Sequence, residues 1–182
     1  MLFTLKDLEL RKIEFAETFA QGKIDLGEET VQKTPLTASG RAELLEEHHG
    51  GKQIVKDIRV VGNFATEVEL RCARCVEAVS LPLSGDFDLL YRPLSTMQRE
   101  DDVSINEAES EIGYYKGEGV ELEEVLKEQI FLAVPMQILC SEDCKGLCPN
   151  CGQNKNVASC DCKKTSDPRW AALADLKDKL KQ

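Results

Sequence analysis

Eight cysteines are the residues of this sequence whose type and spacing are best suited to chemistry. They form four short pairs: Cys72 with Cys75, Cys140 with Cys144, Cys148 with Cys151, and Cys160 with Cys162. Two nearby thiolates can bind one ion without a long excursion of the chain, and a structural zinc ion takes four ligands in a tetrahedron. Four pairs of sulfur ligands therefore predict two zinc ions with a structural role.

The spacing favours one of two ways to divide the pairs between the ions. CPNC and CDC follow each other closely and can close a compact site, which leaves CSEDC to meet the distant CARC. A helical CSEDC would place both of its sulfurs on one face, because residues four apart are neighbours on a helix. In the alternative, one site takes Cys140, Cys144, Cys148 and Cys151, and the other takes Cys72, Cys75, Cys160 and Cys162. Either division clips the C-terminal segment to the region around CARC.

Three other interpretations of the cysteines are weaker. A thioredoxin-like redox centre places its CxxC between a strand and a helix, whereas CARC lies between two predicted strands. Catalytic zinc needs an open position and usually a histidine ligand, but His48 and His49 fall in a predicted turn. The third alternative is free cysteines that bind no metal. We expect structural metal sites.

No other motif predicts catalysis. GYYKGEG, residues 113–119, lacks the lysine and hydroxyl of a phosphate-binding loop and does not begin a helix. A serine nucleophile with an ordered histidine and acid cannot be assembled from this chain. We expect a protein that is not an enzyme and has no small-molecule substrate.

Strands on both sides of CARC are the elements that must position it. From Ile54 to Leu70 apolar residues occupy the even positions, which is typical of a strand with one buried face. A second alternating run follows CARC, with Val79, Leu81, Leu83, Phe87, Leu89 and Tyr91 on one side. The two runs are predicted to pair antiparallel with CARC near their turn. A further strand begins near Leu36 and reverses through HHGG, where two glycines suit a tight turn.

Two helices are predicted in the second half of the chain. ELEEVLKEQIFLAVP has apolar residues at three-and-four spacing, acids at its start and Pro135 at its end. Its predicted buried stripe consists of Leu122, Val125, Leu126, Ile130 and Ala133. In SDPRWAALADLKDKL, Asp167 is a candidate N-cap and Pro168 suits the first helical position. This second helix would pack onto the body through Trp170.

These elements predict an α+β fold with an antiparallel β-sheet or partial barrel, one amphipathic helix, and a C-terminal zinc-binding segment that ends in a helix. Residues 1–92 are expected to form the antiparallel β-rich part with the CxxC hairpin, and residues 93–110 an acidic loop. Residues 111–139 supply a strand and the amphipathic helix of the same domain, and residues 140–182 the cysteine cluster and terminal helix. A chain of 182 residues can bury a core of this kind without disulfides.

The charge of the chain limits the kinds of partner that we expect, and its apolar segments limit the expected location. The formal net charge is -10, and acidic residues are concentrated between Pro93 and Glu128. This argues against generic binding to a phosphate backbone, which needs a concentrated basic face. The N-terminus lacks the apolar core of a signal peptide, and the apolar stretch 130–139 is too short to span a bilayer. We expect a cytoplasmic protein without a membrane partner, where cysteines bind metal more often than they form disulfides.

Several motifs in a fixed order carry a family resemblance. CARC, LKEQIFLAVP, CSEDCKGLCPNCGQNKN, CDC and DPRWAALADLK together resemble the YceD-like family, the large ribosomal RNA subunit accumulation proteins. The resemblance extends from about Ile24 to Leu176. It implies a role in the synthesis, processing or stability of 23S ribosomal RNA without enzymatic activity. This is a role in ribosome biogenesis.

The resemblance and the charge together indicate how such a role would be performed. An acidic protein is expected to reach ribosomal RNA through a basic ribosomal protein or a processing factor. Direct RNA contact would rest on a few basic residues near the cysteines: Lys145, Lys155, Lys163, Lys164 and Arg169. The alternative functions are an adaptor or chaperone-like binder of a basic ribosomal protein, docking through residues 93–128, and a thiol oxidoreductase.

Overall fold

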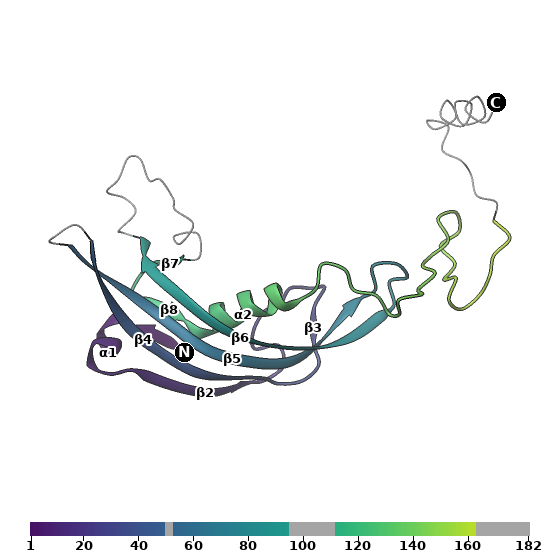
Figure 1. The fold of residues 1–182 in the computed structure, drawn as a ribbon. Coiled ribbons are helices and arrows are strands. Elements are labelled where there is room, and N and C mark those ends of the chain that lie inside the picture. Colours follow the sequence, from purple (N-terminus) through teal and green to yellow (C-terminus); the bar gives the residue numbers. More distant parts are fainter. Residues whose placement is uncertain (50–52, 95–111, 163–182) are drawn as a thin grey trace, which may run out of the picture.

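A strongly curved six-stranded sheet forms most of the molecule, and the computed structural model describes residues 1–49, 53–94 and 112–162 (Figure 1). The sheet has the order β2-β4-β5-β6-β7, and β3 also pairs with β5. Its strands are β2 (Ile13–Phe19), β3 (Val31–Gln32), β4 (Leu36–His49), β5 (Gln53–Arg71), β6 (Ala78–Pro93) and β7 (Ile112–Tyr115). Sheet and helices together give the predicted α+β class.

Two long antiparallel pairings at the centre of the sheet confirm the strands predicted on both sides of CARC. Strand β4 pairs with β5, and β5 pairs with β6 as far as Arg71 opposite Ala78. Ile58, Val60 and Phe64 are all buried, so the even residues of β5 do face the core from Ile58 onward. The residues between β5 and β6 are those that contain CARC, as expected.

The alternation predicted to begin at Ile54 is wrong for the first residues of β5. Ile54 is exposed, whereas Asp57 on the supposedly solvated face is completely buried. The reason is an ion pair across the two strands, in which Arg92 Nη2 lies 2.7 Å from Asp57 Oδ2 and Arg92 Nε donates to Asp57 Oδ1 at 3.1 Å. A buried carboxylate requires such a partner. Asp57 and Arg92 are therefore buried on the face that the alternation assigned to solvent.

The predicted antiparallel sheet is confirmed for every described pairing of the main sheet except the last one. Strand β7 runs parallel to β6, with Leu90 opposite Ile112 and Pro93 opposite Tyr115. The predicted acidic loop, 93–110, lies outside the described residues except for its first two positions. The sheet is mixed because its last strand joins after this connection instead of through a tight hairpin, which would make it antiparallel.

The N-terminal residues add elements that the sequence did not predict. Strand β1 (Leu2–Thr4) pairs antiparallel with β8 (Gly119–Glu121), and helix α1 (Leu5–Leu10) follows directly. Thr4 caps this helix, since its Oγ1 accepts from the Asp7 amide at 3.2 Å. The β1–β8 pair brings the first residues of the chain next to the start of the main helix.

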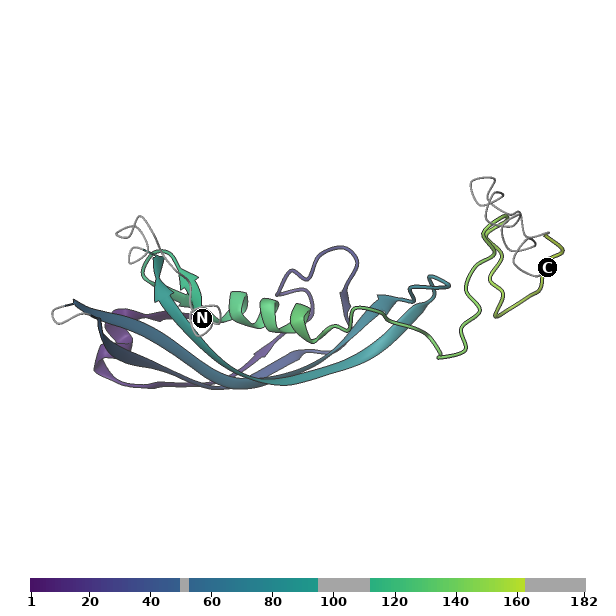
Figure 2. The ribbon, with the colours of Figure 1, turned by 45° about the horizontal axis from the view of Figure 1, so that its top comes forward.

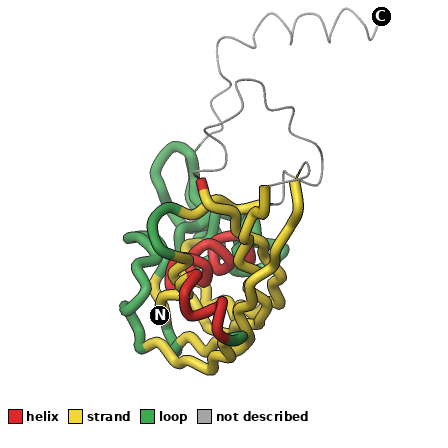
Figure 3. The backbone as a smooth tube through the Cα atoms, turned by 90° about the vertical axis from the view of Figure 1, so that its left-hand side faces the viewer, coloured by secondary structure: helices red, strands yellow, loops and turns green. Residues whose placement is uncertain are grey.

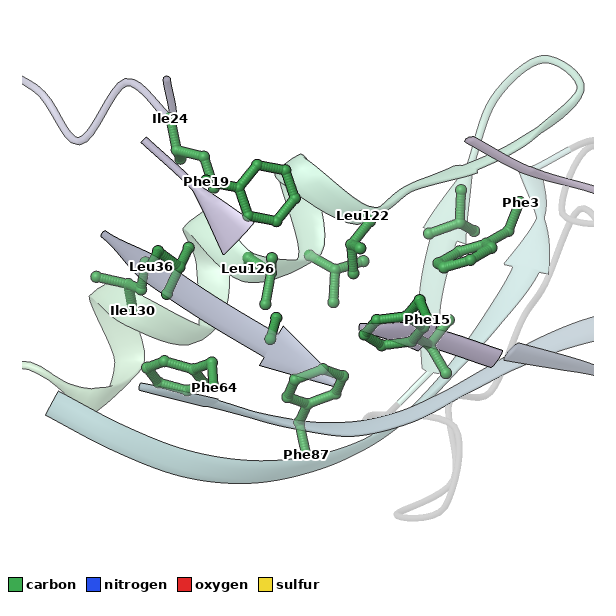
Figure 4. Packing of buried hydrophobic residues seen from close by; sticks show 14 of the residues in the cluster. Phe3, Phe15, Phe19, Ile24, Leu36, Phe64, Phe87, Leu122, Leu126 and Ile130 are labelled. Atoms are coloured by element: carbon green, nitrogen blue, oxygen red, sulfur yellow. The ribbon is translucent and has the colours of Figure 1, made fainter. Parts of the chain in front are cut away.

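The predicted amphipathic helix is confirmed as α2 (Leu122–Ala133), and it lies along the concave side of the sheet (Figure 3). Leu122, Val125, Leu126 and Ile130 are buried, and the helix ends just before Pro135. Figure 4 shows this stripe against phenylalanines from β2, β5 and β6 and against Leu36 of β4. Burying each such side chain contributes about 1.5–3 kcal/mol. Within the described residues no helix combines the length and apolar character that crossing a membrane would need.

A row of four residues explains how the sheet can curve so tightly around α2. Phe15, Gly40, Gly62 and Phe87 lie opposite one another on β2, β4, β5 and β6. A Cβ atom added at Gly40 would lie 2.1 Å from the Val61 carbonyl oxygen, and one at Gly62 would lie 2.9 Å from Cζ of Phe87. The two glycines thus leave room for the strand backbones to approach and for both aromatic rings to lie over them.

Candidate metal centre

The eight cysteines lie at and beyond one end of the sheet, where the β5–β6 turn meets the segment that follows α2 (Figures 1 and 2). Within each of two groups, all four sulfur atoms lie within 4.8 Å of one another. The proximal site comprises Cys72, Cys75, Cys140 and Cys144, and the distal site comprises Cys148, Cys151, Cys160 and Cys162. This is the division that the sequence spacing favoured, and the alternative division does not occur.

The sulfur spacing of the proximal site fits one tetrahedral ion. The Sγ atoms of Cys72 and Cys144 lie 3.8 Å apart, and those of Cys75 and Cys140 lie 3.5 Å apart. Zinc–sulfur bonds of about 2.3 Å place the corners of a tetrahedron about 3.8 Å apart. A disulfide would require about 2.05 Å, and all eight cysteines are free. The donor set and its spacing therefore suit zinc.

A tight turn between β5 and β6 presents the first two sulfurs. The Cys72 amide donates to the Glu77 carbonyl at 2.8 Å, and the Val76 amide donates to the Cys72 carbonyl at 2.9 Å. The turn also directs the Arg74 amide at Cys72 Sγ, at 3.5 Å. It requires a positive φ of 64° at Val76, which is unusual for a β-branched residue. The metal-binding geometry is thus maintained against a local backbone preference.

The distal site contains the same turn. The Cys148 amide donates to the Gln153 carbonyl at 2.8 Å, and the Gly152 amide donates to the Cys148 carbonyl at 2.9 Å. Gly152 has a φ of 73° and occupies the position that corresponds to Val76. Both CxxC motifs therefore fold into one kind of knuckle, although only one is attached to a sheet.

The segment after α2 docks onto the CARC knuckle through backbone and side-chain hydrogen bonds. The Ala73 amide donates to the Ile138 carbonyl at 2.8 Å. Arg74 Nη1 donates to the carbonyls of Glu142 and Cys144 at 3.2 Å and 3.0 Å. In return the Leu147 amide donates to the Arg74 carbonyl at 3.1 Å. Arg74 is thus the central contact of this junction, a role that the sequence did not reveal.

The predicted helical arrangement of CSEDC is wrong. Residues 140–144 form a bend and a turn, in which the Cys144 amide donates to the Ser141 carbonyl at 3.1 Å. The Cys140 amide donates to Cys72 Sγ at 3.4 Å. Cys140 and Cys144 join the proximal group because the Cys140 amide and the sulfurs of both residues face the CARC knuckle.

Asn156, in the loop between the distal cysteine pairs, donates to the proximal site and was not predicted as a functional residue. Its Nδ2 donates to Cys144 Sγ at 3.3 Å, and its Oδ1 accepts from the Lys145 amide at 2.8 Å. The Asn156 amide in turn donates to Asn154 Oδ1 at 3.0 Å. Hydrogen bonds of this kind hold metal ligands in place. The only sequence signal was the position of Asn156 in GQNKN, directly after the knuckle.

Within each group the sulfurs and the backbone amides shift the pKa values of individual thiols in opposite directions. Burial raises the pKa of Cys72, but hydrogen bonds from the amides of Arg74, Cys75 and Cys140 outweigh it and lower this pKa to about 6. In the distal site the Cys151 and Asn150 amides lower the pKa of Cys148 to about 6, whereas the neighbouring Cys151 raises that of Cys162 to about 12. A divalent cation would replace the remaining protons and balance the negative charge.

The two sites differ in exposure but share a closed ligand set. Cys72, Cys75 and Cys144 are buried in the proximal site, whereas only Cys148 is buried in the distal one. Among the described residues no histidine, aspartate or glutamate joins either group. The predicted turn position of His48 and His49 is wrong, since both belong to β4, paired with Ile54 and Gln53 at the end of β5 opposite CARC. Four sulfurs around one ion leave no open position for a substrate.

The predicted C-terminal helix, residues 167–180 with Trp170, lies outside the described residues, as do Lys163, Lys164 and Arg169. The remaining basic candidates for RNA contact, Lys145 and Lys155, are near the knuckles. The Lys155 amide donates to the Gly146 carbonyl at 2.9 Å.

Comparison with known proteins gives the family of the chain. The family model described as "Large ribosomal RNA subunit accumulation protein YceD" matches residues 60–177. The uncharacterized protein YlbN of Bacillus subtilis (strain 168) is 28% identical, over 96% of this chain and 94% of the relative. "Large ribosomal RNA subunit accumulation protein YCED homolog 1, chloroplastic" of Arabidopsis thaliana is 22% identical, over 70% of this chain and 46% of the relative. No solved structure matches. The chain belongs to the YceD family of large ribosomal RNA subunit accumulation proteins.

Proposed function

We propose that this protein is a non-enzymatic ribosome-biogenesis factor that supports the accumulation of 23S ribosomal RNA, with two structural zinc ions. The match to a family named for accumulation of large-subunit ribosomal RNA carries the proposal. The chloroplast relative bears the same description in its name. The cytoplasm, where bacterial ribosomes assemble, is the proposed place of action.

The structural role proposed for zinc is supported by the geometry of both sites. Each consists of four sulfurs alone, and a site of this composition holds its ion without an open position for catalysis. The proximal site joins a turn of the sheet to a segment that follows it by more than sixty residues. Its ion would hold residues 138–147 at the turn, because the described contacts between this segment and the turn surround the same four cysteines.

The thiol oxidoreductase alternative is less well supported. A redox pair needs one accessible thiolate and a second cysteine to resolve it. Here Cys72 and Cys75 are almost completely buried, and each lies next to a sulfur of Cys144 or Cys140 as well. Metal analysis of the purified chain separates the two functions. Two zinc ions per chain support the structural role, and a metal-free protein with reactive thiols would favour redox chemistry.

The cellular function is tested by deleting the gene from its own host and measuring the ratio of 23S to 16S ribosomal RNA. We expect the ratio to fall, together with the amount of large-subunit particles in a sucrose gradient. Re-expression of the original chain should restore both quantities, whereas the Cys72→Ser/Cys75→Ser variant should not. An unchanged ratio in the deletion strain would overturn the proposed function.

A further inference from the structure

A groove between β7, β8 and the outer side of α2 is a surface feature that the metal sites leave unused. Its volume is about 920 Å³. All three tyrosines of the chain line it: Tyr91 of β6 and Tyr114 and Tyr115 of β7. We call it the tyrosine groove. It is formed by an edge of the sheet, by β8, and by the face of α2 that does not contact the core.

The outer side of α2 is apolar where it borders the groove. Phe131 is 44% exposed and Leu132 is 71% exposed, although the core already uses a separate stripe of the same helix. Tyr114 on the opposite wall is 39% exposed. Adjacent apolar side chains on a surface are typical of interaction sites, and tyrosine is enriched in protein interfaces. The groove thus offers apolar and aromatic contacts to a partner.

Glutamate carboxylates lie around the apolar side chains of the groove. The lining residues include Glu118, Glu121, Glu124 and Glu128. None of these four forms an ion pair with a described residue. The lining also includes Lys116 and Lys127, of which Lys127 lies 3.9 Å from Asp25, so four glutamates face two lysines. Burial, and then the nearby Glu128 carboxylate, raise the pKa of Tyr91 to about 12, so this phenol stays neutral in the wall. The rim therefore favours cations and repels anions.

One further group in the wall lacks a partner within the described part of the chain. The Tyr115 hydroxyl is buried there and makes no hydrogen bond. A buried hydroxyl without a partner is costly, and in native structures it calls for an explanation.

We propose that the tyrosine groove binds an extended segment of a basic protein in which arginine or lysine alternates with apolar residues. Its apolar side chains would contact Phe131 and Leu132, and its cations would lie near the glutamates and over the tyrosine rings. The inference rests on the proposed function, because large-subunit assembly supplies such basic proteins. RNA is the poorer occupant, since four carboxylates would face its phosphates.

The test uses the full-length, zinc-loaded chain and a fluorescein-labelled twelve-residue peptide of alternating arginine and leucine. Fluorescence anisotropy is expected to show saturable binding that weakens as salt is raised. Binding should be at least about tenfold weaker for an alternating glutamate and leucine peptide and for an arginine and serine peptide. Equal binding of the arginine and serine peptide would overturn the groove, because charge alone would then explain the affinity.

Two variants locate the binding. We expect at least about tenfold weaker binding of the arginine and leucine peptide in Glu124→Gln/Glu128→Gln and in Leu132→Ser. Zinc content and thermal unfolding should stay unchanged in both variants. The matched control is Glu14→Gln/Glu17→Gln, which removes the same charge from exposed positions of β2 and should bind like the original chain. Equal losses in the control and the groove variants would overturn the inference. So would a single-stranded RNA oligonucleotide that competes with the peptide and loses affinity in Leu132→Ser.

A complementation assay separates this inference from the function on which it rests. Deletion of the gene could leave the amount of 23S ribosomal RNA unchanged while the groove variants still bind the peptide more weakly than the original chain. This result would refute the proposed cellular function and support the peptide-binding groove. Deletion could instead lower the amount of 23S ribosomal RNA while the groove variants bind the peptide and restore the RNA as well as the control variant does. This result would refute peptide binding in the groove and support the proposed cellular function.

Discussion

Removing zinc should release residues 138–147 from the sheet, because hydrogen bonds alone are too weak to hold them. Five hydrogen bonds join this segment to residues 72–74, and at about 1 kcal/mol each they contribute about 5 kcal/mol. Fixing ten backbone residues costs about 10–20 kcal/mol. A structural zinc ion supplies about 10–16 kcal/mol, which closes the difference.

The assay is amide hydrogen exchange before and after chelation. The Ala73 and Leu147 amides, which donate across the junction, should exchange at least about a thousandfold faster in the chelated protein. Chelation removes the contribution of zinc, about 10–16 kcal/mol, and a loss of only about 5 kcal/mol is already more than three factors of ten in exchange rate. The amide of Val60 in the middle of β5 serves as the internal reference and should change little.

A variant distinguishes the two ions in the same experiment. Cys160→Ser/Cys162→Ser should contain one zinc ion per chain and keep Ala73 and Leu147 protected. Cys72→Ser/Cys75→Ser should also contain one ion, but with both amides unprotected. Continued protection of these amides in fully chelated protein would refute the view that metal holds the junction together.

Three further predictions concern single residues. Gly152→Val should weaken the distal zinc site about 5–30-fold in a titration against a chromophoric chelator, because the left-handed backbone costs a β-branched residue about 1–2 kcal/mol and no atom lies near its added Cβ. Asn156→Ala should lower zinc affinity about 10–100-fold by removing the donor to Cys144 Sγ; an unchanged affinity would exclude a role for this amide. Gly40→Ala should lower the free energy of unfolding in urea by about 3 kcal/mol or more, since the added Cβ would meet a backbone oxygen. Gly85→Ala should lower it by only about 1 kcal/mol, because its added Cβ would meet only the ring of Phe64, at 3.0 Å. Equal losses for the two glycines would contradict the structure.

Hydrophobic periodicity correctly predicted the elements that bury a single face. Strands β5 and β6 and helix α2 each have one apolar stripe, and the structure places those stripes in one core. The prediction was wrong at Asp57, where alternation could not show that Arg92 covers the other face. It also missed the parallel direction of β7, because a strand of four residues contains no information about its partner.

For the candidate metal sites, too, the sequence predicted what depends on local spacing and missed contacts between distant segments. The spacing of the cysteine pairs favoured the observed grouping, since nearby pairs have few ways to meet. The contacts that complete the sites come from Arg74 and Asn156, whose hydrogen bonds depend on a junction of distant segments. Arginine and asparagine in a loop resemble solvated residues until that junction is known. The tyrosine groove was hidden for the same reason, because Tyr91 lies far from Tyr114 and Tyr115 in the sequence.

The row of Phe15, Gly40, Gly62 and Phe87 across β2, β4, β5 and β6 has a consequence for the evolution of this fold. A side chain at Gly40 or Gly62 would meet backbone oxygens of the neighbouring strand, and no exchange of another side chain can remove a carbonyl. Gly85, in contrast, meets only the ring of Phe64. Among descendants of this sequence, position 85 is therefore free to drift if position 64 shrinks with it, whereas positions 40 and 62 can change only with the curvature of the whole sheet.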